Sequence, residues 1–540
     1  MPHAGVDFHL GCDETRGIPP PRRRPTGGGP LKVPVNLSDA RIRSSDFVLA
    51  LLHGRELAPV APLRSWEKRD RTVLFNSYEF WIFFAIVFVL YRLLPHRGQN
   101  VLLLVASNIF YGWWDWRFLI LLLFSTVLDY GSGIWIERST TQKWKKTLLV
   151  VSVVVNLTFL SFFKYYGFFA REMMELLSSF GIEASLPSLN IILPVGISFY
   201  TFNSMSYVID VYRGVVKAEP DLLTYSVYVC YFPHMVAGPI QRATSLLPQV
   251  ARPRSFTAND FVEGLYHVII GLFKKIVIAD NMATIANAIF LADTATLSGG
   301  EILVGVYAFA FQIYGDFSGY SSIAQGTSKW LGIDLTTNFR MPYLATSPSD
   351  FWKRWHISLS SWLRDYLYVS LGGNRRGKWK TYRNLMLTMF LGGLWHGAGW
   401  TFIAWGTFHG LILCLYRPFE KAKSPRRSPI KTVLAVLLMF HVVCFGWLLF
   451  RAQSMTQVWQ MLVRLTTHWF MTPFAWHCLA ATAFFCGPLL VFEWWLDRKG
   501  DLLLLTRSSW LNRGLVYAYC TLMMLFFCAE IPHEFIYFQF

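Results

Sequence analysis

The sequence has few charged residues. Only 15% of its 540 residues are Asp, Glu, Lys or Arg, whereas a soluble domain usually carries about a quarter. Hydrophobic residues make up 54% and aromatic residues 17%, and the mean hydropathy is +0.36. This balance is typical of a chain solvated by lipid, so the composition predicts an integral membrane protein.

Several catalytic motifs are also absent. The sequence has no G-x-S-x-G nucleophile elbow, no P-loop and no H-E-x-x-H pair, so it gives no support to a hydrolase, an ATPase or a metalloprotease. None of the eight cysteines forms a C-x-x-C pair, and seven of them lie in apolar segments. Buried free thiols are therefore favoured over disulfides or zinc ligands. We expect no metal site and no bound cofactor.

Negative charge is scarcer than positive charge. Lys and Arg number 50 against 33 Asp and Glu, a net charge of +17. In a membrane protein such an excess is most simply the charge of cytoplasmic loops. Nucleic-acid binding is the alternative, but the sequence has no zinc-finger spacing, RNA-recognition signature or continuous basic helix. The expected partner is thus the lipid bilayer, and no nucleic acid.

Residues 1–72 differ from the remainder. They contain Arg22-Arg23-Arg24, Gly27-Gly28-Gly29 and several prolines, but no long apolar run. The apolar stretch 47–52 is too short for the core of a signal peptide. We expect a disordered tail, with the further hypothesis that the native chain starts near Val73 and that 1–72 is a non-native extension. The membrane domain would then be 73–540.

Apolar runs follow one another from Tyr78 onward. A span needs roughly 20 mainly apolar residues, and segments of 10–14 are short enough to be re-entrant or interfacial. We predict about 11 crossings and no internal repeat, which weakens a repeat-built transporter. The predicted segments are 78–94, 100–111, 118–136, 147–163, 190–211, 222–236, 261–279, 302–324, 385–415, 433–450, 476–495 and 514–528.

Basic clusters predict a sharp turn in one of these segments. Residues 384–416 lie between two clusters that should both be cytoplasmic, yet one straight helix of that length would span about 50 Å, against a hydrocarbon core of ~30 Å. The segment must therefore turn back, and glycines gather around His396. Such a break is tolerated only inside protein or beside water. The clusters are Lys143, Lys145 and Lys146; Arg375, Arg376, Lys378, Lys380 and Arg383; and Arg417, Lys421, Lys423, Arg426, Arg427 and Lys431.

The stretch 350–371 mixes aromatic and charged residues. It reads DFWKRWHISLSSWLRDYLYVSL, and Asp350 is placed to cap it. Its apolar residues recur on one helical face and His356 lies beside them, which predicts an interfacial amphipathic helix. The apolar face comprises Phe351, Trp355, Leu359, Trp362 and Tyr366.

Polar side chains inside apolar segments are candidates for chemistry, since they are costly unless paired or functional. Histidine can take a proton from a hydroxyl and return it to a leaving group near neutral pH, as acyl transfer requires. The glycines, the flanking Trp395 and Trp400, and a second histidine favour His396. For Asp316 we expect a structural ion pair with Arg340 or Arg354 rather than direct catalysis. For His409, His267 and His441 a packing role is favoured, and the remaining candidates are His356, Asp210 and Asp129.

Three long motifs resemble the membrane-bound O-acyltransferase family. They are FQIYGDFSGYSSIAQG (311–326), NFRMPYLATSPSDFWKRWHISLSSWLRDYLY (338–368) and GGLWHGAGWTFIAWGTFHG (392–410). The segments 193–214, 232–242 and the terminal FIYFQF are similar to the bacterial alginate O-acetylation branch, with His234-Met235 as a departure. The resemblance covers about 73–540.

The resemblance implies a curved ring of about 11 transmembrane helices, with re-entrant and amphipathic helices, around a central tunnel. It implies that His396 and His356 are catalytic, with His396 as general base and His356 assisting across the tunnel. The residues expected to line the tunnel are Asp316, Arg354, Trp355, Trp395 and His409.

The same resemblance implies an acetyltransferase of the bacterial inner membrane. The donor would be cytoplasmic acetyl-CoA, whose phosphates the basic loops at 374–383 and 421–431 would attract. The acceptor would be an exported polysaccharide such as alginate. An SGNH-type periplasmic or membrane-anchored acetyltransferase and the polysaccharide synthesis machinery are the expected partners.

Two alternatives stay open. The enzyme could transfer D-alanine or another acyl group to a cell-envelope polymer. The chain could also be a transporter or scaffold without chemistry, which would predict charged pairs inside the membrane and repeated broken helices. The sequence shows neither clearly.

Overall fold

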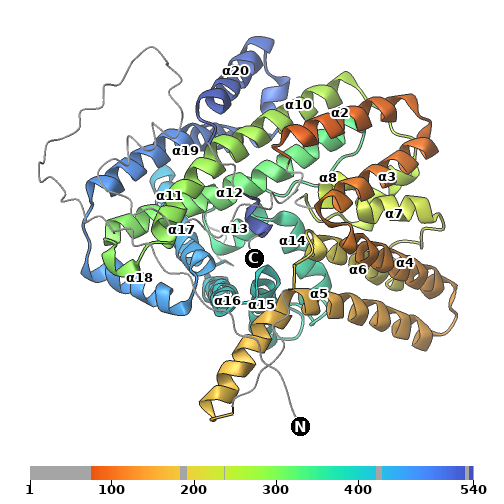
Figure 1. Cartoon of the computed structure of the whole chain (residues 1–540), viewed down its shortest axis with the longest axis horizontal. Coiled ribbons are helices and arrows are strands. Elements are labelled where there is room, and N and C mark those ends of the chain that lie inside the picture. Colours follow the sequence, from red (N-terminus) through yellow and green to blue (C-terminus); the bar gives the residue numbers. More distant parts are fainter. Residues whose placement is uncertain (1–74, 183–190, 236–237, 421–427, 530–533, 539–540) are drawn as a thin grey trace, which may run out of the picture. The chain divides into compact units, whose positions relative to one another are not determined.

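The computed structural model describes residues 75–182, 191–235, 238–420, 428–529 and 534–538. Within them every regular element is a helix, which confirms the predicted all-α class (Figure 1). All of them belong to one unit, Arg43–Phe540. The predicted extension 1–72 lies outside the described residues.

The elements follow one another with short connections. The α-helices are α2 (Tyr78–Leu93), α3 (His96–Asp115), α4 (Arg117–Arg138), α5 (Gln142–Ser179), α6 (Ile197–Tyr212), α7 (Leu222–Cys230), α8 (Phe232–Met235), α9 (Ala243–Ala251), α10 (Ala258–Phe273), α11 (Asp280–Phe290), α12 (Gly299–Trp330), α13 (Pro348–Arg354), α14 (Ile357–Trp362), α15 (Lys378–His396), α16 (Trp400–Glu420), α17 (Pro429–Arg451), α18 (Met455–Thr467), α19 (Pro473–Lys499) and α20 (Trp510–Phe526). The π- and 3₁₀-helical turns are η1 (Lys274–Ala279), η2 (Thr294–Thr296), η3 (Pro342–Leu344), η4 (Leu363–Tyr368), η5 (Leu504–Arg507) and η6 (Ile536–Phe538).

Five of the described helices are long and apolar enough to cross a membrane: α4, α5, α12, α17 and α19. Other predicted segments form shorter helices. The segment 222–236, for example, contains α7, whose nine residues reach only about 13 Å at 1.5 Å per residue. The ring of about 11 crossings stays a prediction.

Helix α12 is the element around which the others pack. Its first turn is fixed by a capping box. The Ser298 hydroxyl accepts a hydrogen bond from the backbone N–H of Glu301, and the Glu301 carboxylate accepts one from the backbone N–H of Ser298. Glycines bring α10 and α12 close together: a Cβ on Gly326 would lie 2.6 Å from the carbonyl oxygen of Gly264. Small residues allow such close approach between membrane helices. Figure 1 shows the two helices side by side.

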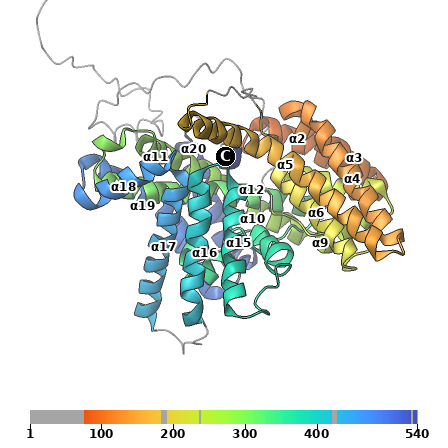
Figure 2. The same cartoon turned by 90° about the horizontal axis from the view of Figure 1, so that it is seen from below.

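The predicted turn around His396 is confirmed. Helix α15 ends at His396, residues 397–399 form the turn, and α16 starts at Trp400. The two helices run side by side next to α17 (Figure 2). They touch through glycine, because the Cα of Gly406 would lie 3.0 Å from a Cβ on Gly393.

The predicted single amphipathic helix over 350–371 is wrong. The stretch is divided into α13, α14 and η4, with a break at Trp355 and His356. The predicted cap is also wrong, because the side chain of Ser347, not that of Asp350, accepts the hydrogen bond at the start of α13. The break arises at His356, whose left-handed backbone (φ 41°) cannot continue a helix.

The α15–α16 contact provides a test of this packing. We expect Gly393→Ala to force the helices apart, because its new methyl group would collide with the carbonyl oxygen of Phe402. Overpacking of this kind costs about 1–3 kcal/mol. The melting temperature of the detergent-solubilised protein should fall. Gly487→Ala is the matched control, since nothing lies within 4 Å of a Cβ there. Equal melting temperatures for the two variants would contradict the packing described.

Candidate functional site

His396 lies at the end of α15 and is surrounded by aromatic rings. Its side chain is buried, and its ring centroid lies 4.9 Å from those of both Trp395 and Trp405. Phe450 (5.4 Å) and Tyr537 (5.8 Å) complete the surroundings. Its Nδ1 atom is buried without a hydrogen-bond partner among the described residues. A buried imidazole nitrogen left in this way is available to a substrate.

His356 is held by Asn338. The imidazole Nδ1 lies 3.2 Å from Asn338 Oδ1, and the backbone N–H of Ile357 donates to the Asn338 carbonyl at 2.9 Å. The Ser358 hydroxyl donates to the same Oδ1 at 2.9 Å. These bonds keep His356 in a backbone conformation that is strained for a residue other than glycine.

The bonds of Asn338 also determine the tautomer of His356. Asn338 Nδ2 donates to Ser321 Oγ at 3.2 Å, so its Oδ1 faces His356. A carbonyl oxygen only accepts, and Nδ1 of His356 must therefore carry the hydrogen. The lone pair then resides on Nε2, which is buried without a hydrogen-bond partner in the described part of the chain. A neutral imidazole in this tautomer presents a base at Nε2.

The indole ring of Trp395 packs against both histidines. Its ring centroid is 4.9 Å from that of His396 and 6.0 Å from that of His356. Phe199 and Phe202 pack against it at 5.8 and 5.5 Å. The structure thus brings together three of the predicted site residues, His396, His356 and Trp395.

Two further predicted residues lie one aromatic ring away. His409 is buried on α16, with its ring 4.8 Å from Trp405, the residue that also contacts His396. Trp355 is buried against Trp447 at 4.8 Å. Both side chains therefore belong to the aromatic packing around the histidines.

Arg354 lies away from the histidines. Its guanidinium donates to Asp350 at 2.9 Å and to Asp497 at 2.7 Å. Both contacts are partly exposed. The structure therefore gives Arg354 a surface ion-pair role and does not bring it to the tunnel-lining position that was predicted.

Asp316 is ion-paired, but the predicted partners Arg340 and Arg354 are wrong. Its Oδ1 lies 3.0 Å from the ammonium of Lys275, in a pair that is almost fully buried. The reason lies in the backbone: η1 places Lys275 against α12, where Gly319 has no Cβ to keep it away. No spacing in the sequence indicates this contact.

The C-terminal segment 534–538 contributes one of the aromatic rings around His396. The backbone N–H of Ile536 donates to Asp316 Oδ2 at 2.7 Å, and Ile536 is buried. Tyr537 then packs against Phe317 at 4.8 Å and against His396 at 5.8 Å. Figure 1 shows this end of the chain in the middle of the view. In the sequence FIYFQF was only a family motif, and the contact of its Tyr537 with His396 was missed.

The other polar candidates have structural partners. Asp129 accepts hydrogen bonds from side chains of α5, and Asp210 accepts one from the Tyr366 hydroxyl at 2.7 Å. His441 lies 2.7 Å from the Tyr307 hydroxyl. These contacts agree with the packing role expected of His441.

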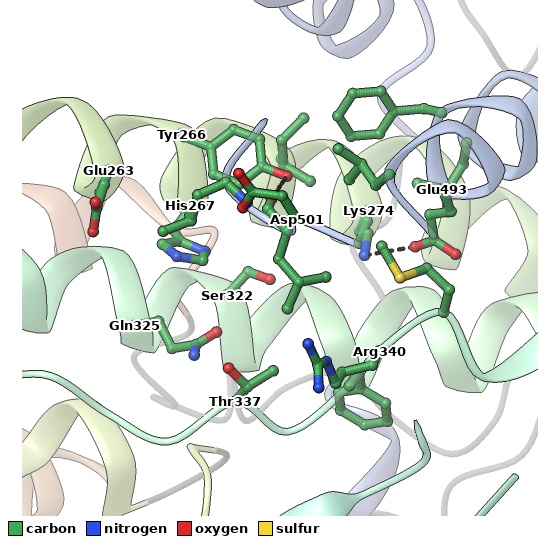
Figure 3. A pocket seen from close by; sticks show the side chains of 18 of the residues that line it. Glu263, Tyr266, His267, Lys274, Ser322, Gln325, Thr337, Arg340, Glu493 and Asp501 are labelled. Atoms are coloured by element: carbon green, nitrogen blue, oxygen red, sulfur yellow. Dashed lines mark hydrogen bonds and ion pairs between the residues drawn. The ribbon is translucent and has the colours of Figure 1, made fainter. Parts of the chain in front are cut away.

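A cavity of about 460 Å³ lies near His356. Lys274 and Glu493, which pair at 3.0 Å, line it together with His267. Its wall includes Phe339, whose ring lies 6.5 Å from that of His356. In Figure 3 the guanidinium of Arg340 points into this cavity.

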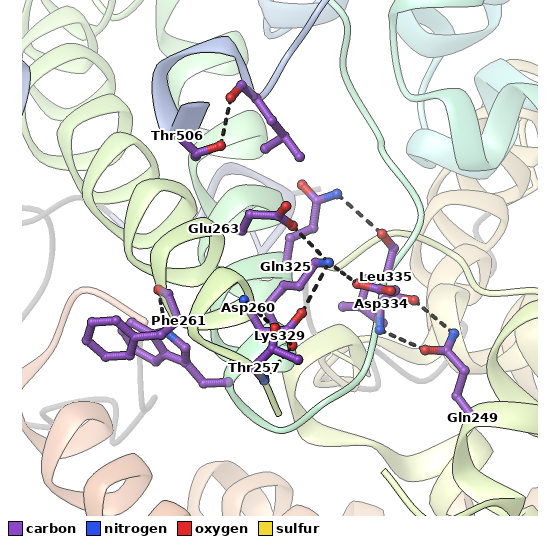
Figure 4. Close-up of polar contacts among 12 residues, drawn as sticks. Gln249, Thr257, Asp260, Phe261, Glu263, Gln325, Lys329, Asp334, Leu335 and Thr506 are labelled. Atoms are coloured by element: carbon purple, nitrogen blue, oxygen red, sulfur yellow. Dashed lines mark hydrogen bonds and ion pairs between the residues drawn. The ribbon is translucent and has the colours of Figure 1, made fainter. Parts of the chain in front are cut away.

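The charges at the rim of the cavity largely neutralise one another. Lys329 lies 2.9 Å from Glu263 and 2.5 Å from Asp334 (Figure 4). Asp501, a further wall residue, pairs with Arg507 at 2.9 Å. In the described residues no such partner neutralises Arg340. Among the described residues that line the cavity, Arg340 is therefore the cation left without a neutralising partner, and it adjoins Phe339 in the chain.

Comparison with known proteins assigns the family. Residues 215–450 match the membrane-bound O-acyltransferase family. The chain is 43% identical to the probable alginate O-acetylase of Pseudomonas aeruginosa, over 72% of this chain and 74% of that protein. It is 44% identical to the Azotobacter vinelandii protein of the same name (72% and 77%) and 35% identical to the peptidoglycan O-acetyltransferase of Helicobacter pylori (71% and 78%). The chain belongs to the membrane-bound O-acyltransferase family.

Membership makes the chain a multi-pass membrane acyltransferase. It also corrects an argument from the sequence. Charged pairs inside the apolar segments were expected of a transporter or scaffold, yet this acyltransferase has two buried pairs, Lys274–Glu493 and Lys275–Asp316. In this enzyme such pairs join helices.

The Asp316 contacts provide a test of the C-terminal anchor. We expect Asp316→Ala to release the terminal segment, because it removes the acceptor of the Ile536 N–H and one counter-charge of Lys275. Removing one partner of a buried pair costs about 3–5 kcal/mol. Carboxypeptidase should then digest the C-terminus of the variant faster than that of the wild type. The melting temperature of the variant should also be lower.

Asp334→Ala is the control for that experiment, since its pair with Lys329 is largely exposed and should contribute only about 0–1 kcal/mol. A terminus as resistant in Asp316→Ala as in the control would show that this anchor is absent.

Proposed function

We propose that this enzyme moves an acetyl group from cytoplasmic acetyl-CoA across the bacterial inner membrane for the O-acetylation of an exported polysaccharide such as alginate. The observation that carries the proposal is the pair of buried imidazoles that both pack against Trp395, each with a buried ring nitrogen left unbonded by the described residues. The similarity to alginate O-acetylases supports the acetyl group and the acceptor. Peptidoglycan is the second candidate acceptor, favoured by the Helicobacter pylori relative. D-alanyl transfer stays the alternative reaction.

The chemistry assigned to the site is attack of a hydroxyl on a thioester. His396 acts as general base and removes the proton of the hydroxyl. The new C–O bond forms at the acetyl carbonyl, the C–S bond breaks, and the proton passes to the departing thiolate. His356 assists through Nε2, the atom that Asn338 leaves with the lone pair. The aromatic rings around the two histidines exclude water, which strengthens the electrostatic interactions between the histidines and the reacting groups.

For the donor we propose the cavity beside His356. A phosphate of coenzyme A would pair with Arg340, because guanidinium binds phosphate in a bidentate manner and no described residue neutralises this one. Phe339, the neighbour of Arg340 in the chain, lines the same cavity, and its ring lies 6.5 Å from that of His356. The basic loop at 374–383 would attract the donor from the cytoplasm. The second predicted basic loop, 421–431, lies mostly outside the described residues.

The remaining expectations form part of the same proposal. The short helices and the spans would form a curved ring of about 11 crossings around a tunnel, with the basic loops on the cytoplasmic side. An SGNH-type acetyltransferase at the far side of the membrane would pass the acetyl group to the polymer, beside the polysaccharide synthesis machinery. The paired histidines supply the transfer step that such an assembly needs.

The catalytic assignment is tested by His396→Ala. The purified protein in lipid nanodiscs should lose at least about 100-fold in acetyl transfer from radiolabelled acetyl-CoA, since general base catalysis contributes 10²–10⁴-fold. His441→Ala is the matched control, because this histidine is exposed and bonded to Tyr307. Transfer by His396→Ala at the rate of the control would refute the assignment.

The donor cavity is tested by Arg340→Gln. We expect KM for acetyl-CoA to rise about tenfold, the equivalent of 1.4 kcal/mol. The change in kcat should be smaller, because the contact that is removed binds the donor equally in the ground state and in the transition state. Arg507→Gln removes an exposed cation of the ion pair with Asp501 and should leave KM unchanged. Equal KM values for acetyl-CoA in Arg340→Gln and Arg507→Gln would show that the donor does not bind at Arg340.

A further inference from the structure

The helix that carries His396 ends in an unusual way. The last four carbonyls of an α-helix have no partner within it. A left-handed glycine commonly bonds them, but Gly397 is extended (φ −164°), and its N–H reaches Gly393 at only 3.4 Å. The carbonyls just before His396 therefore depend on other groups.

Two side chains of α5 supply those groups. The hydroxyl of Tyr165 donates to the carbonyl of Leu394 at 2.7 Å. The ammonium of Lys164 donates to the carbonyl of Trp395. More than two hundred residues of sequence separate the donors from the acceptors, so this contact exists only in the folded chain.

The ammonium of Lys164 is bound mainly by the end of α15. It lies 5.6 Å from the centre of the Trp395 ring, and no carboxylate pairs with it in the described part of the chain. The partial negative charge at a helix C-terminus favours a cation there, and so does the face of an indole ring. These two interactions offset part of the cost of a lysine on a helix that is apolar enough to span a membrane.

A third contact from α5 holds the other side of the turn. The indole N–H of Trp400, the first residue of α16, donates to Glu172 at 3.0 Å. The three-residue turn after His396 is thus held from both ends by one helix. The cation acts on the carbonyl directly before His396.

We propose that Lys164 is a positioning residue for acyl transfer. By holding the carbonyl of Trp395, it sets the rotation of the last turn of α15 and with it the direction of the His396 imidazole relative to Trp395 and His356. This inference rests on the proposed function of His396. A misplacement of 1 Å in a reacting group can cost about 10²-fold in rate, so a small rotation is sufficient to matter.

The test compares three variants of α5 in nanodiscs with radiolabelled acetyl-CoA. Lys164→Met keeps the length of the side chain and removes its donor. It should lower kcat at least tenfold, while KM for acetyl-CoA and the melting temperature stay close to wild type. Lys164→Arg, whose guanidinium can still donate to the Trp395 carbonyl, should recover kcat to within about threefold. Lys146→Met, an exposed lysine on the same helix, should match wild type.

Three outcomes would overturn the inference. The first is wild-type kcat in Lys164→Met beside an inactive His396→Ala, which leaves the proposed function intact. The second is an arginine variant as slow as Lys164→Met. The third is a parallel fall of kcat and melting temperature in Lys164→Met, which would make the lysine only a structural group. Full activity in His396→Ala would instead overturn the proposed function, and this inference with it.

Discussion

Inside a membrane, a break in a helix exposes backbone groups that lipid cannot satisfy, so protein side chains must bond them. In this enzyme both histidines lie at such breaks, since one break follows His396 and another lies at His356. The terminal segment at Ile536 also has a backbone group that a distant side chain bonds. Polar side chains from distant elements bind the backbone at each, and the arrangement of the histidines depends on these bonds.

A different kind of side chain bonds the backbone at each of these three places. Lysine and tyrosine side chains donate to carbonyls at the end of α15. Asn338 accepts from the backbone N–H groups after His356 and from its ring. Asp316 accepts from Ile536 while Lys275 balances its charge. The scarce charged residues of the apolar segments are therefore not spread evenly, because a charge there is tolerated only with such partners.

This dependence explains what the sequence could predict. The turn at His396 followed from local information, since two basic clusters and four glycines leave no other geometry. The break at His356 did not, because the aromatic periodicity of 350–371 fits a helix, and the bonds of Asn338, 18 residues before His356, show otherwise. The partner of Asp316 was missed for the same reason, as it required the π-helical turn η1.

The spans themselves were predicted better than their ends. Apolar runs mark α4, α12 and α17, because the length and composition of a segment decide whether it can cross a membrane. Helix α5 extends far past its predicted span of 147–163, to Ser179. The extension starts with Lys164 and Tyr165, whose polar groups end the apolar pattern, yet the helix continues because the end of α15 bonds them.

The two histidines are held by different means, which bears on their roles. The ring of His356 is fixed directly, through Nδ1, so its proton-accepting atom is determined before any substrate arrives. The Nδ1 of His396 has no bond to the described residues, and this ring is oriented through the backbone of α15 and the aromatic rings around it. A base that must take a proton from one group and return it to another benefits from that freedom. A partner with one preset nitrogen suits a group that only stabilises or relays charge, so these contacts support the proposed roles of His396 as base and His356 as assistant.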